Sequence, residues 1–189
     1  MADITHGAWI KDGKAVDAVY SNGKQVYGRN LLPSTNQGLT NWTFGTGAGG
    51  QYIKDTFDVP NGQGIMVRTT VAYTNWFYLG YKINYTVLKQ NTDYVLSFWA
   101  KSTDIGRYLY AKFSTDDASK SSAIFGAVGL NAGVDTKVVL RATTNNVDFN
   151  EQFLYFNSFN MVGGIDIWDL KLEVGTLATP WTPAPEDVM

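Results

Sequence analysis

Short runs of alternating residues, separated by clusters of turn residues, limit the fold of this chain more than any other feature of its sequence. Apolar and polar residues alternate over 65–72, 94–101, 108–113, 137–143, 153–157 and 165–173. Turn-forming Gly, Asn, Asp and Thr residues lie between these runs, for example at 61–64 and 144–146. No stretch longer than about ten residues keeps a helical period. Many short strands with such spacing predict an all-β sandwich or jelly roll.

The composition is that of one folded domain with more aromatic rings than its core requires. The chain has 189 residues, of which 44% are hydrophobic and only 17% are charged, and this balance excludes a disordered chain. It carries 6 Trp, 11 Tyr and 10 Phe residues. Because a core of this size does not need so many large rings, we expect some of them to be exposed for use.

Charge and rare residue types exclude several classes of function. The formal net charge of −2 argues against a nucleic-acid binder that works by phosphate neutralisation. The chain has no Cys, which removes thiol catalysis, disulfides and zinc–thiolate sites. The single His, His6, excludes most transition-metal sites and any ordinary Ser-His-Asp triad that does not use it.

The first 29 residues have a pattern of their own. The dipeptides Asp12-Gly13 and Asn22-Gly23 both favour the tight turn of a β-hairpin. We expect a three-stranded meander that is too small to own a core and docks on the following domain or on a partner. This divides the chain into an N-terminal β-hairpin attachment segment (1–29), a main domain (30–182) that folds without it, and a C-terminal tail (183–189).

Alternation also assigns side chains to faces. In 94–101, 107–113 and 153–157, one parity is apolar and suited to a core, and the other carries rings and polar groups. If these strands share a sheet, the second set forms one aromatic surface. Its members are Trp99, Lys101, Tyr108, Tyr110, Lys112, Tyr155 and Asn157. The alternative is that a loop or helix covers these residues as a second core layer.

Several stretches of the chain resemble known proteins. GRNLLP at 28–33 and GLTNW at 38–42 resemble the opening strand of jelly-roll carbohydrate-binding modules of the four/nine/twenty-two type, and YVLSFWAK at 94–101 resembles their central strand. WDLKLEVG at 168–175 and ATPWTPAP at 178–185 are similar to the closing strand and tail of tail, baseplate and neck proteins of phages of Gram-positive bacteria. The lead-in at 9–30 also resembles a segment common in such phage proteins. The resemblance implies a sugar-binding jelly roll on a virion that adheres to cell-wall polysaccharide.

Sugar binding needs flat apolar faces together with polar side chains for hydroxyl groups, and the aromatic surface defined above supplies both. Trp76 stands in a second aromatic and polar cluster at 73–78, either as a loop tip that contributes to the site or as a packed ring. Trp42 and Trp181 lie in the family-like ends, and we interpret them as structural.

The resemblance also implies a metal site. The resembled modules often hold a structural Ca²⁺ near the join of their first and last strands, and Asn30 and Asp169 are the nearest candidates for its ligands here. Their spacing fits no loop motif such as an EF-hand. The alternative is that both are polar residues of turns and strand edges.

Catalysis finds little support in the sequence. The only Glu residues are Glu151, Glu173 and Glu186, whereas a glycosidase needs two carboxylates about 5–10 Å apart. We interpret Glu173, with Asp166 and Asp169 nearby, as a solvated charge at a strand edge. The expected function is therefore non-catalytic binding. A virion decoration protein without a ligand and a cell-wall glycosidase are the alternatives.

The start of the chain lacks the basic and apolar regions of an export signal. Together with the resemblance, this predicts a virion component of the tail, baseplate or neck that is made in the host cytoplasm. The expected partners are a surface polysaccharide of a Gram-positive host, other virion proteins and further copies of the chain. Nucleic acid and membrane are not expected partners.

Overall fold

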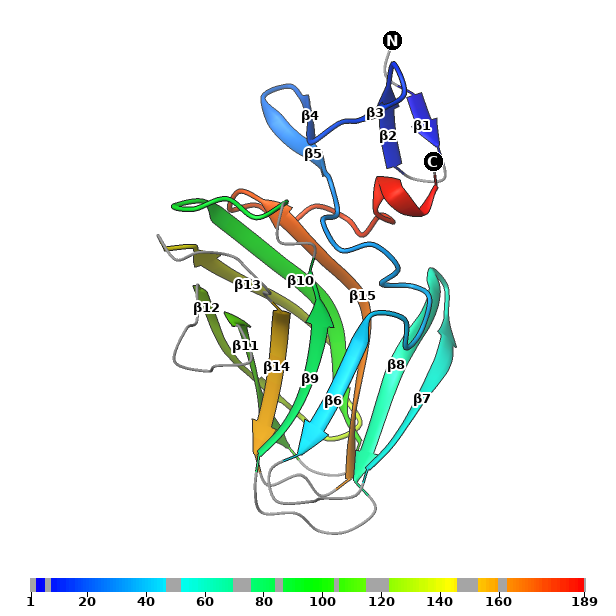
Figure 1. Cartoon of the computed structure of the whole chain (residues 1–189), viewed down its shortest axis with the longest axis vertical. Helices are drawn as coiled ribbons and strands as arrows, with labels where there is room; N and C mark the ends of the chain where they lie inside the picture. The colour runs from blue at the N-terminus through cyan, green and yellow to red at the C-terminus, as the bar shows by residue number, and fades with distance from the viewer. Residues whose placement is uncertain are drawn as a thin grey trace.

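The computed structural model of the chain is almost entirely β-structure. It describes residues 3–5, 8–46, 52–69, 76–83, 87–103, 106–114, 123–145, 153–159 and 163–188. Within these ranges, two five-stranded sheets face one another as a sandwich, and two small sheets lie at the N-terminus (Figure 1). The predicted all-β jelly-roll sandwich is confirmed. None of the helical structure in these ranges has the length and apolar character needed to cross a membrane.

We name the two large sheets after one strand each. The β10 sheet has the order β13-β10-β15-β8-β7, with strands Thr136–Thr143, Asp93–Ser102, Gly163–Val174, Gly62–Thr69 and Tyr52–Val59. The β11 sheet has the order β12-β11-β14-β9-β6, with strands Ala123–Leu130, Arg107–Ser114, Phe153–Phe159, Trp76–Lys82 and Trp42–Thr46. All neighbouring strands in both sheets are antiparallel.

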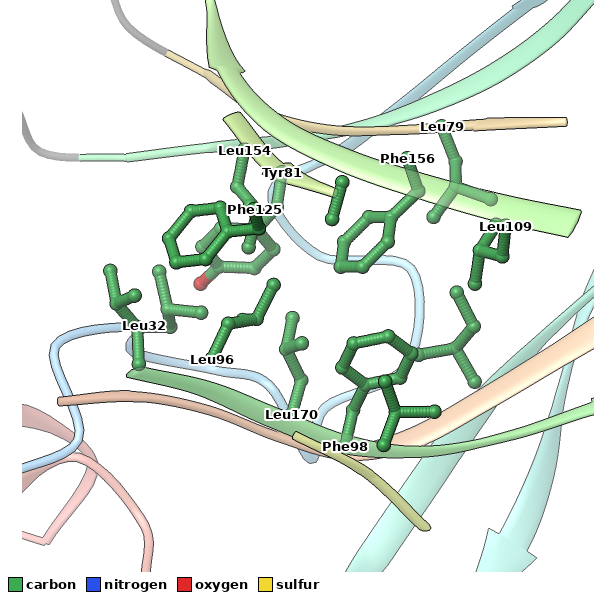
Figure 2. Close-up of a cluster of buried hydrophobic side chains, with 14 of the residues drawn as sticks. Leu32, Leu79, Tyr81, Leu96, Phe98, Leu109, Phe125, Leu154, Phe156 and Leu170 are labelled. Carbon is green, nitrogen blue, oxygen red and sulfur yellow. The ribbon is translucent and has the colours of Figure 1, made fainter. Parts of the chain in front are cut away.

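Alternation along the strands fills the space between the two sheets. The inward residues of β10 have the parity that the sequence predicts, and all are fully buried: Tyr94, Leu96, Phe98 and Ala100. Phe98 meets Phe156 of β14 edge to face, with ring centroids 5.2 Å apart. Figure 2 shows leucine and phenylalanine side chains from both sheets meeting in this layer. The inward residues therefore complete the core without any outward ring.

The six predicted runs correspond to β8, β10, β11, β13, β14 and β15, although the end of the first run lies outside the described residues. The alternation does not indicate β6, β7, β9 or β12. Glycines interrupt the pattern of β6, β9 and β12, and β7 is an edge strand with polar residues on both faces. Strands at edges or with glycine need no regular alternation of apolar residues.

The attachment segment forms two small sheets. One contains β1 (Asp3–Thr5), β2 (Ala8–Lys11) and β3 (Lys14–Ala15), and the other pairs β4 (Ala18–Ser21) with β5 (Lys24–Gly28). Both predicted turns are confirmed. All four of their residues have positive φ, between 50° and 75°, as in a type I′ turn.

The prediction of a single three-stranded meander is wrong. The chain leaves the first small sheet after β3, and β4 pairs only with β5. The physical reason lies at Asp17, whose backbone carbonyl accepts a hydrogen bond from the backbone N–H of Arg29 at 2.8 Å. The second hairpin therefore closes on its own return strand and does not extend the first sheet.

The last residues of the attachment segment pack on the sandwich. Tyr27 is 3% exposed, its ring lies 6.3 Å from that of Trp9, and the Lys171 ammonium of β15 lies 5.5 Å from its ring centroid. The backbone N–H of Gly28 donates to Thr179 Oγ1 at 3.1 Å. Tyr27 and Gly28 therefore pack against the main domain, and the domain boundary at Asn30 stays a prediction.

The lead-in (9–30) and the segment that follows β15 (175–188) cover one half of the outer face of the β10 sheet. This second segment, called the tail from here on, contains the 3₁₀ turn η4 (Pro185–Asp187). The outward residues of that half are Val95, Ser97, Lys171 and Glu173, each at most 1% exposed. The other half carries Trp99 and Trp168, which are only half-buried. This division decides which part of the face is open to a ligand.

We expect truncation to separate the two parts of the attachment segment. Deleting residues 1–16 removes β1–β3 and should lower the melting temperature slightly, because Trp9 no longer contacts Tyr27. Deleting residues 1–29 also removes the buried Tyr27 ring, which should cost about 1.5–3 kcal/mol more, and uncovers Lys171 and Glu173. Thermal melts of the two truncated chains check this. Equal melting temperatures would place 27–29 outside the folded domain.

Candidate functional site

The structure divides the predicted aromatic surface between the two sheets. Tyr108, Tyr110 and Lys112 lie on β11, next to Tyr155 and Asn157 on β14, and all five share the outer face of the β11 sheet. Trp99 and Lys101 lie on β10, in the other sheet. Because the two outer faces point away from each other, the expectation of one shared surface is wrong for Trp99 and Lys101. Parity assigns faces within a strand, but it does not determine which strands are neighbours.

The register aligns outward residues of the β11 sheet in rows. In one row, Tyr110 stands opposite Asn157, which stands opposite Tyr78 of β9. In the next row, Lys112 stands opposite Tyr155. Directly opposite residues have Cβ atoms about 4.5–5.5 Å apart, so the side chains form one patch. We call this patch the tyrosine face, and its members are Tyr78, Tyr108, Tyr110, Lys112, Tyr155 and Asn157.

Glycines on neighbouring strands give the tyrosine face its shape. A Cβ atom at Gly45 of β6 would overlap the Tyr78 ring, and one at Gly80 of β9 would lie 3.0 Å from Tyr155 Cε1. Both rings therefore lean over the adjacent strand. They contact each other edge to face, with centroids 5.5 Å apart and planes at 78°. The result is a low aromatic floor at the β6 side of the sheet.

Rings and polar groups alternate on the tyrosine face, and part of it is open. Tyr108 is 64% exposed and Tyr110 is 42% exposed, which excludes a second core layer over these two rings. The side chains of Asn157 and Lys112 have no hydrogen-bond or ion-pair partner among the described residues. An amide both donates and accepts hydrogen bonds, and an ammonium donates up to three. The patch thus presents polar groups between apolar rings.

Tyr78 is the member of this face that sequence reasoning misses. Leu79 and Tyr81 are buried in the core, so their parity predicts Tyr78 and Gly80 on the opposite face. Trp76, which the sequence offers as a loop tip or a packed ring, is the first residue of β9 and not a loop residue. Its side chain lies outside the described residues.

The two tryptophans interpreted as structural lie apart from the tyrosine face. Trp42 is buried and contacts Tyr81 edge to face, with ring centroids 5.2 Å apart. Trp181 is half-buried and lines a cavity of about 610 Å³ between the tail and the β7–β8 hairpin, together with Asn36 and Asn61.

Asn30 is fully occupied by protein hydrogen bonds. Its Nδ2 donates to the carbonyls of Leu170 and Thr182, and its Oδ1 accepts from the backbone N–H groups of Leu32 and Leu172, all at 3.2 Å. This amide fastens the start of the main domain to β15 and the tail. Because both lone pairs of Oδ1 are used, the arrangement does not fit Asn30 as a metal ligand.

Asp169 has a structural contact of its own, since its Oδ2 accepts a hydrogen bond from Asn61 Nδ2 at 2.9 Å. Among the described residues, no three Asp, Glu or His side chains gather in a way that could hold a metal ion. The calcium prediction stays a prediction, without support from these two residues.

Glu173 is buried, so its interpretation as a solvated edge charge is wrong. It accepts hydrogen bonds from the Thr179 backbone N–H at 2.9 Å and the Thr179 hydroxyl at 2.6 Å. The Lys171 ammonium lies 3.5 Å from Glu173 Oε2 and donates to Thr179 Oγ1 at 2.8 Å. The tail folds back over this pair, which leaves no room for a substrate. Glu151 lies outside the described residues, and Glu186 pairs with Arg29.

Burial dominates the electrostatics of this pair. It lowers the pKa of Lys171 to about 8, against the attraction of Glu173. It also raises the pKa of Glu173, against Lys171 and the hydrogen bonds from Thr179. Both pKa shifts reflect the free energy cost of removing the two charged groups from water. The pair therefore secures the tail without offering a reactive group to solvent.

We expect removal of one partner to be costly. Lys171→Met leaves Glu173 buried without its cation and should lower the free energy of unfolding by about 3–5 kcal/mol. The paired change Lys171→Met/Glu173→Leu replaces both charges by apolar groups and should cost clearly less. Urea unfolding measures both variants. A larger loss for the paired change would contradict this account.

The same pair should leave a signature in the pH dependence of stability. The pKa of Lys171 is about 8 when folded, below its ordinary 10.5, so the unfolded chain holds this proton more tightly. Its contribution to stability therefore rises as pH increases from about 8 toward 10.5. Between pH 8 and 10, unfolding free energy should rise more with pH in the natural chain than in the paired Lys171→Met/Glu173→Leu variant. Parallel pH profiles would show that Lys171 does not titrate in this window.

Chelation tests the calcium prediction. Because Asn30 is saturated by protein donors and acceptors, we expect EDTA to leave the melting temperature unchanged. A lower melting temperature that added Ca²⁺ restores would establish a structural ion held by other residues.

No protein-family model matches the sequence, and no curated protein matches it. Solved structures match in fold. The C-terminal family 22 carbohydrate-binding module of Clostridium thermocellum Xyn10B has a TM-score of 0.57 at 13% identity, over 81% of this chain and 96% of that one. A family 11 carbohydrate-binding module from Clostridium thermocellum, solved with a β-1,3-1,4-mixed-linked tetrasaccharide, has a TM-score of 0.53 at 13% identity, over 77% and 95%.

A phage protein is also among the matches. The enzymatically active domain of tailspike protein 4 of bacteriophage CBA120 has a TM-score of 0.51 at 19% identity, over 77% of this chain and 21% of that one. The chain therefore spans about a fifth of that tailspike structure. Identities this low establish a common architecture and not a common activity. The chain has the jelly-roll fold of carbohydrate-binding modules.

Proposed function

We propose that this protein binds carbohydrate without catalysing a reaction, and that the tyrosine face is its site. The observation that carries the proposal is the patch itself, with the exposed rings of Tyr108 and Tyr110 beside the polar groups of Asn157 and Lys112, which have no partner among the described residues. A pyranose offers C–H groups to the rings and hydroxyls to the amide and the ammonium. The core is complete without these rings, so a ligand explains why they face water.

We also propose that the protein is an accessory component of a phage tail, baseplate or neck, made in the host cytoplasm. Its ligand is then a cell-wall or surface polysaccharide of a Gram-positive host. The likeness of the lead-in and of 168–185 to such phage proteins, and the fold shared with a phage tailspike domain, support this assignment. The two small N-terminal sheets attach the module to other virion proteins.

A single shallow site of this kind binds weakly. Each ring contributes about 0.5–1.5 kcal/mol beyond the burial of its area, so a few rings give a Kd of roughly millimolar to micromolar. Many copies on one particle raise the effective affinity, because the second and later contacts are intramolecular. Weak sites on a multivalent particle suit reversible adhesion to a surface.

Substitution of two rings of the tyrosine face tests the site. Tyr110→Ala and Tyr155→Ala should each weaken polysaccharide binding several-fold, and Tyr110→Ala should change the melting temperature little because that ring is 42% exposed. Tyr20→Ala, at a ring that is 65% exposed on β4, is the matched control and should leave binding unchanged. Affinity electrophoresis in gels containing host cell-wall polysaccharide measures all three.

Two outcomes would contradict the proposal. Large losses of stability with unchanged binding would make the tyrosines structural. No binding by the natural chain to host cells, or to any sugar on a glycan array, would favour a virion decoration protein without a ligand.

A further inference from the structure

A second line of rings crosses the open half of the β10 sheet, on the opposite side of the sandwich from the tyrosine face. Trp99 of β10 stands opposite Trp168 of β15, with ring planes 9° apart and centroids 6.1 Å apart. Trp168 contacts Phe57 of β7 edge to face, with centroids 5.8 Å apart. We call Trp99, Trp168 and Phe57 the tryptophan ladder. Because these residues lie on β10, β15 and β7, the ladder runs across the strands of the β10 sheet and passes over β8. Figure 1 shows these four strands.

A β-bulge turns Trp168 outward. Leu170 and Leu172 face the core, and by their parity residue 168 would face the core as well. Between the pairs Ser97–Lys171 and Trp99–Trp168, however, β15 has one residue more than β10. The extra residue shifts the parity, so Trp168 points to the outer face beside Trp99.

The bulge involves backbone strain. Asp169 has a φ of +51°, a left-handed conformation that costs a non-glycine residue about 1–2 kcal/mol. Its carboxylate is held by Asn61 Nδ2 at 2.9 Å. Bulges occur often beside functional sites, where they re-aim a side chain. Here the strain takes a tryptophan out of the core and places it on a half-open surface, an arrangement that packing alone does not require.

A glycine keeps the ladder continuous across β8. A Cβ atom at Gly64 would lie 2.5 Å from Phe57 Cζ and 3.0 Å from Trp168 Cβ. Any side chain at this position would push the Phe57 ring away. Because the position is glycine, Phe57 reaches over β8 to Trp168 and no other side chain interrupts the line of rings.

Charged side chains border the ladder and balance one another. Lys101 lies 3.2 Å from Asp135 and 3.9 Å from Asp166, and Asp166 lies 2.7 Å from Arg68. These two cations and two anions balance one another, so this end of the ladder carries no strong field of either sign. The Lys101 ammonium also lies 6.0 Å from the Trp168 ring centroid. Donors and acceptors for hydroxyl groups therefore stand next to apolar rings, as a neutral polyhydroxyl ligand requires.

Lys137 of β13 closes the other end of the ladder. Its ammonium lies 5.7 Å from the Trp99 ring centroid, and the side chain is exposed. Two nearly parallel indoles with an ammonium beside each make a repeated unit, one ring and one donor, along the line of the ladder. Such a repeat matches a chain of similar sugar residues better than a single small molecule.

We propose that the tryptophan ladder is a second binding site, which holds a neutral glycan chain laid across the strands of the β10 sheet. The inference rests on the proposed function, since it assumes a carbohydrate ligand, but it concerns the opposite side of the molecule. One module then holds two glycan chains on its two outer faces. It cross-links the polysaccharide to which it binds.

Four chains test the inference: the natural chain, Tyr110→Ala/Tyr155→Ala, Trp99→Ala/Trp168→Ala, and the chain with all four changes. The probe is purified Gram-positive cell-wall polysaccharide freed of phosphate by hydrofluoric acid. Retardation in affinity gels measures binding, and turbidity measures cross-linking. We expect each double variant to keep weakened binding but to lose turbidity, and the fourfold variant to lose both.

The Tyr110→Ala/Tyr155→Ala variant gives the most direct test, because it keeps the tryptophan ladder intact. Added polysaccharide should change its tryptophan emission, and its retardation should change less than about twofold between low and high salt, as expected for a neutral ligand. Failure of this variant to bind would overturn the ladder site whether or not the tryptophan variants fold. Strong weakening by salt would overturn the neutral glycan.

The design separates the two sites. If the tyrosine changes abolish all binding while the tryptophan changes have no effect, the proposed function stands and the ladder inference fails. If the reverse holds, the ladder is the site and the tyrosine face is not. If the natural chain neither binds the polysaccharide nor makes its solution turbid, both the proposed function and the ladder inference fail.

Discussion

The fold depends on contacts such as that of Phe98 with Phe156, where inward residues of two sheets interlock across the sandwich. Alternate residues of a strand point to opposite faces of its sheet. Because the inward-facing residues complete the core, the outward-facing residues are available for other roles. On the β11 sheet the outward-facing residues form the tyrosine face. On the β10 sheet the outer face is divided into a half that the lead-in and the tail cover and a half that is open.

The covered half shows how the ends of the chain are fastened. Lys171 and Glu173 are fully buried under residues of the lead-in and the tail, and Thr179 bonds to both. A buried ion pair is weak evidence for stability as such, because desolvation offsets much of its attraction. Its effect is positional. Together with Asn30, it determines where the tail crosses the sheet, and so which part of the outer face stays open.

The two proposed binding surfaces lie on opposite sides of the molecule. A catalytic site gathers converging groups in one enclosed place, whereas these rings lie in rows on open sheets. The carboxylate that the sequence placed nearest to a catalytic role, Glu173, is enclosed by the tail. Under the proposed function, binding at two outer faces, repeated over many copies, would hold a particle to a polysaccharide layer by many weak contacts.

The sequence by itself determined the all-β class, the two type I′ turns and the facing of β10, β11 and β14, because turn chemistry and a two-residue period are local properties. It identified most of the tyrosine face for the same reason. The tertiary structure alone decided that Trp99 lies in a different sheet from Tyr110, that Tyr78 completes the patch, and that the tail buries Glu173. It also decided the outward turn of Trp168, because residue 168 has the core parity of Leu170 until a bulge at Asp169 reverses it. Strand order, bulges and the path of a tail depend on contacts between residues far apart in the chain, and no local period records them.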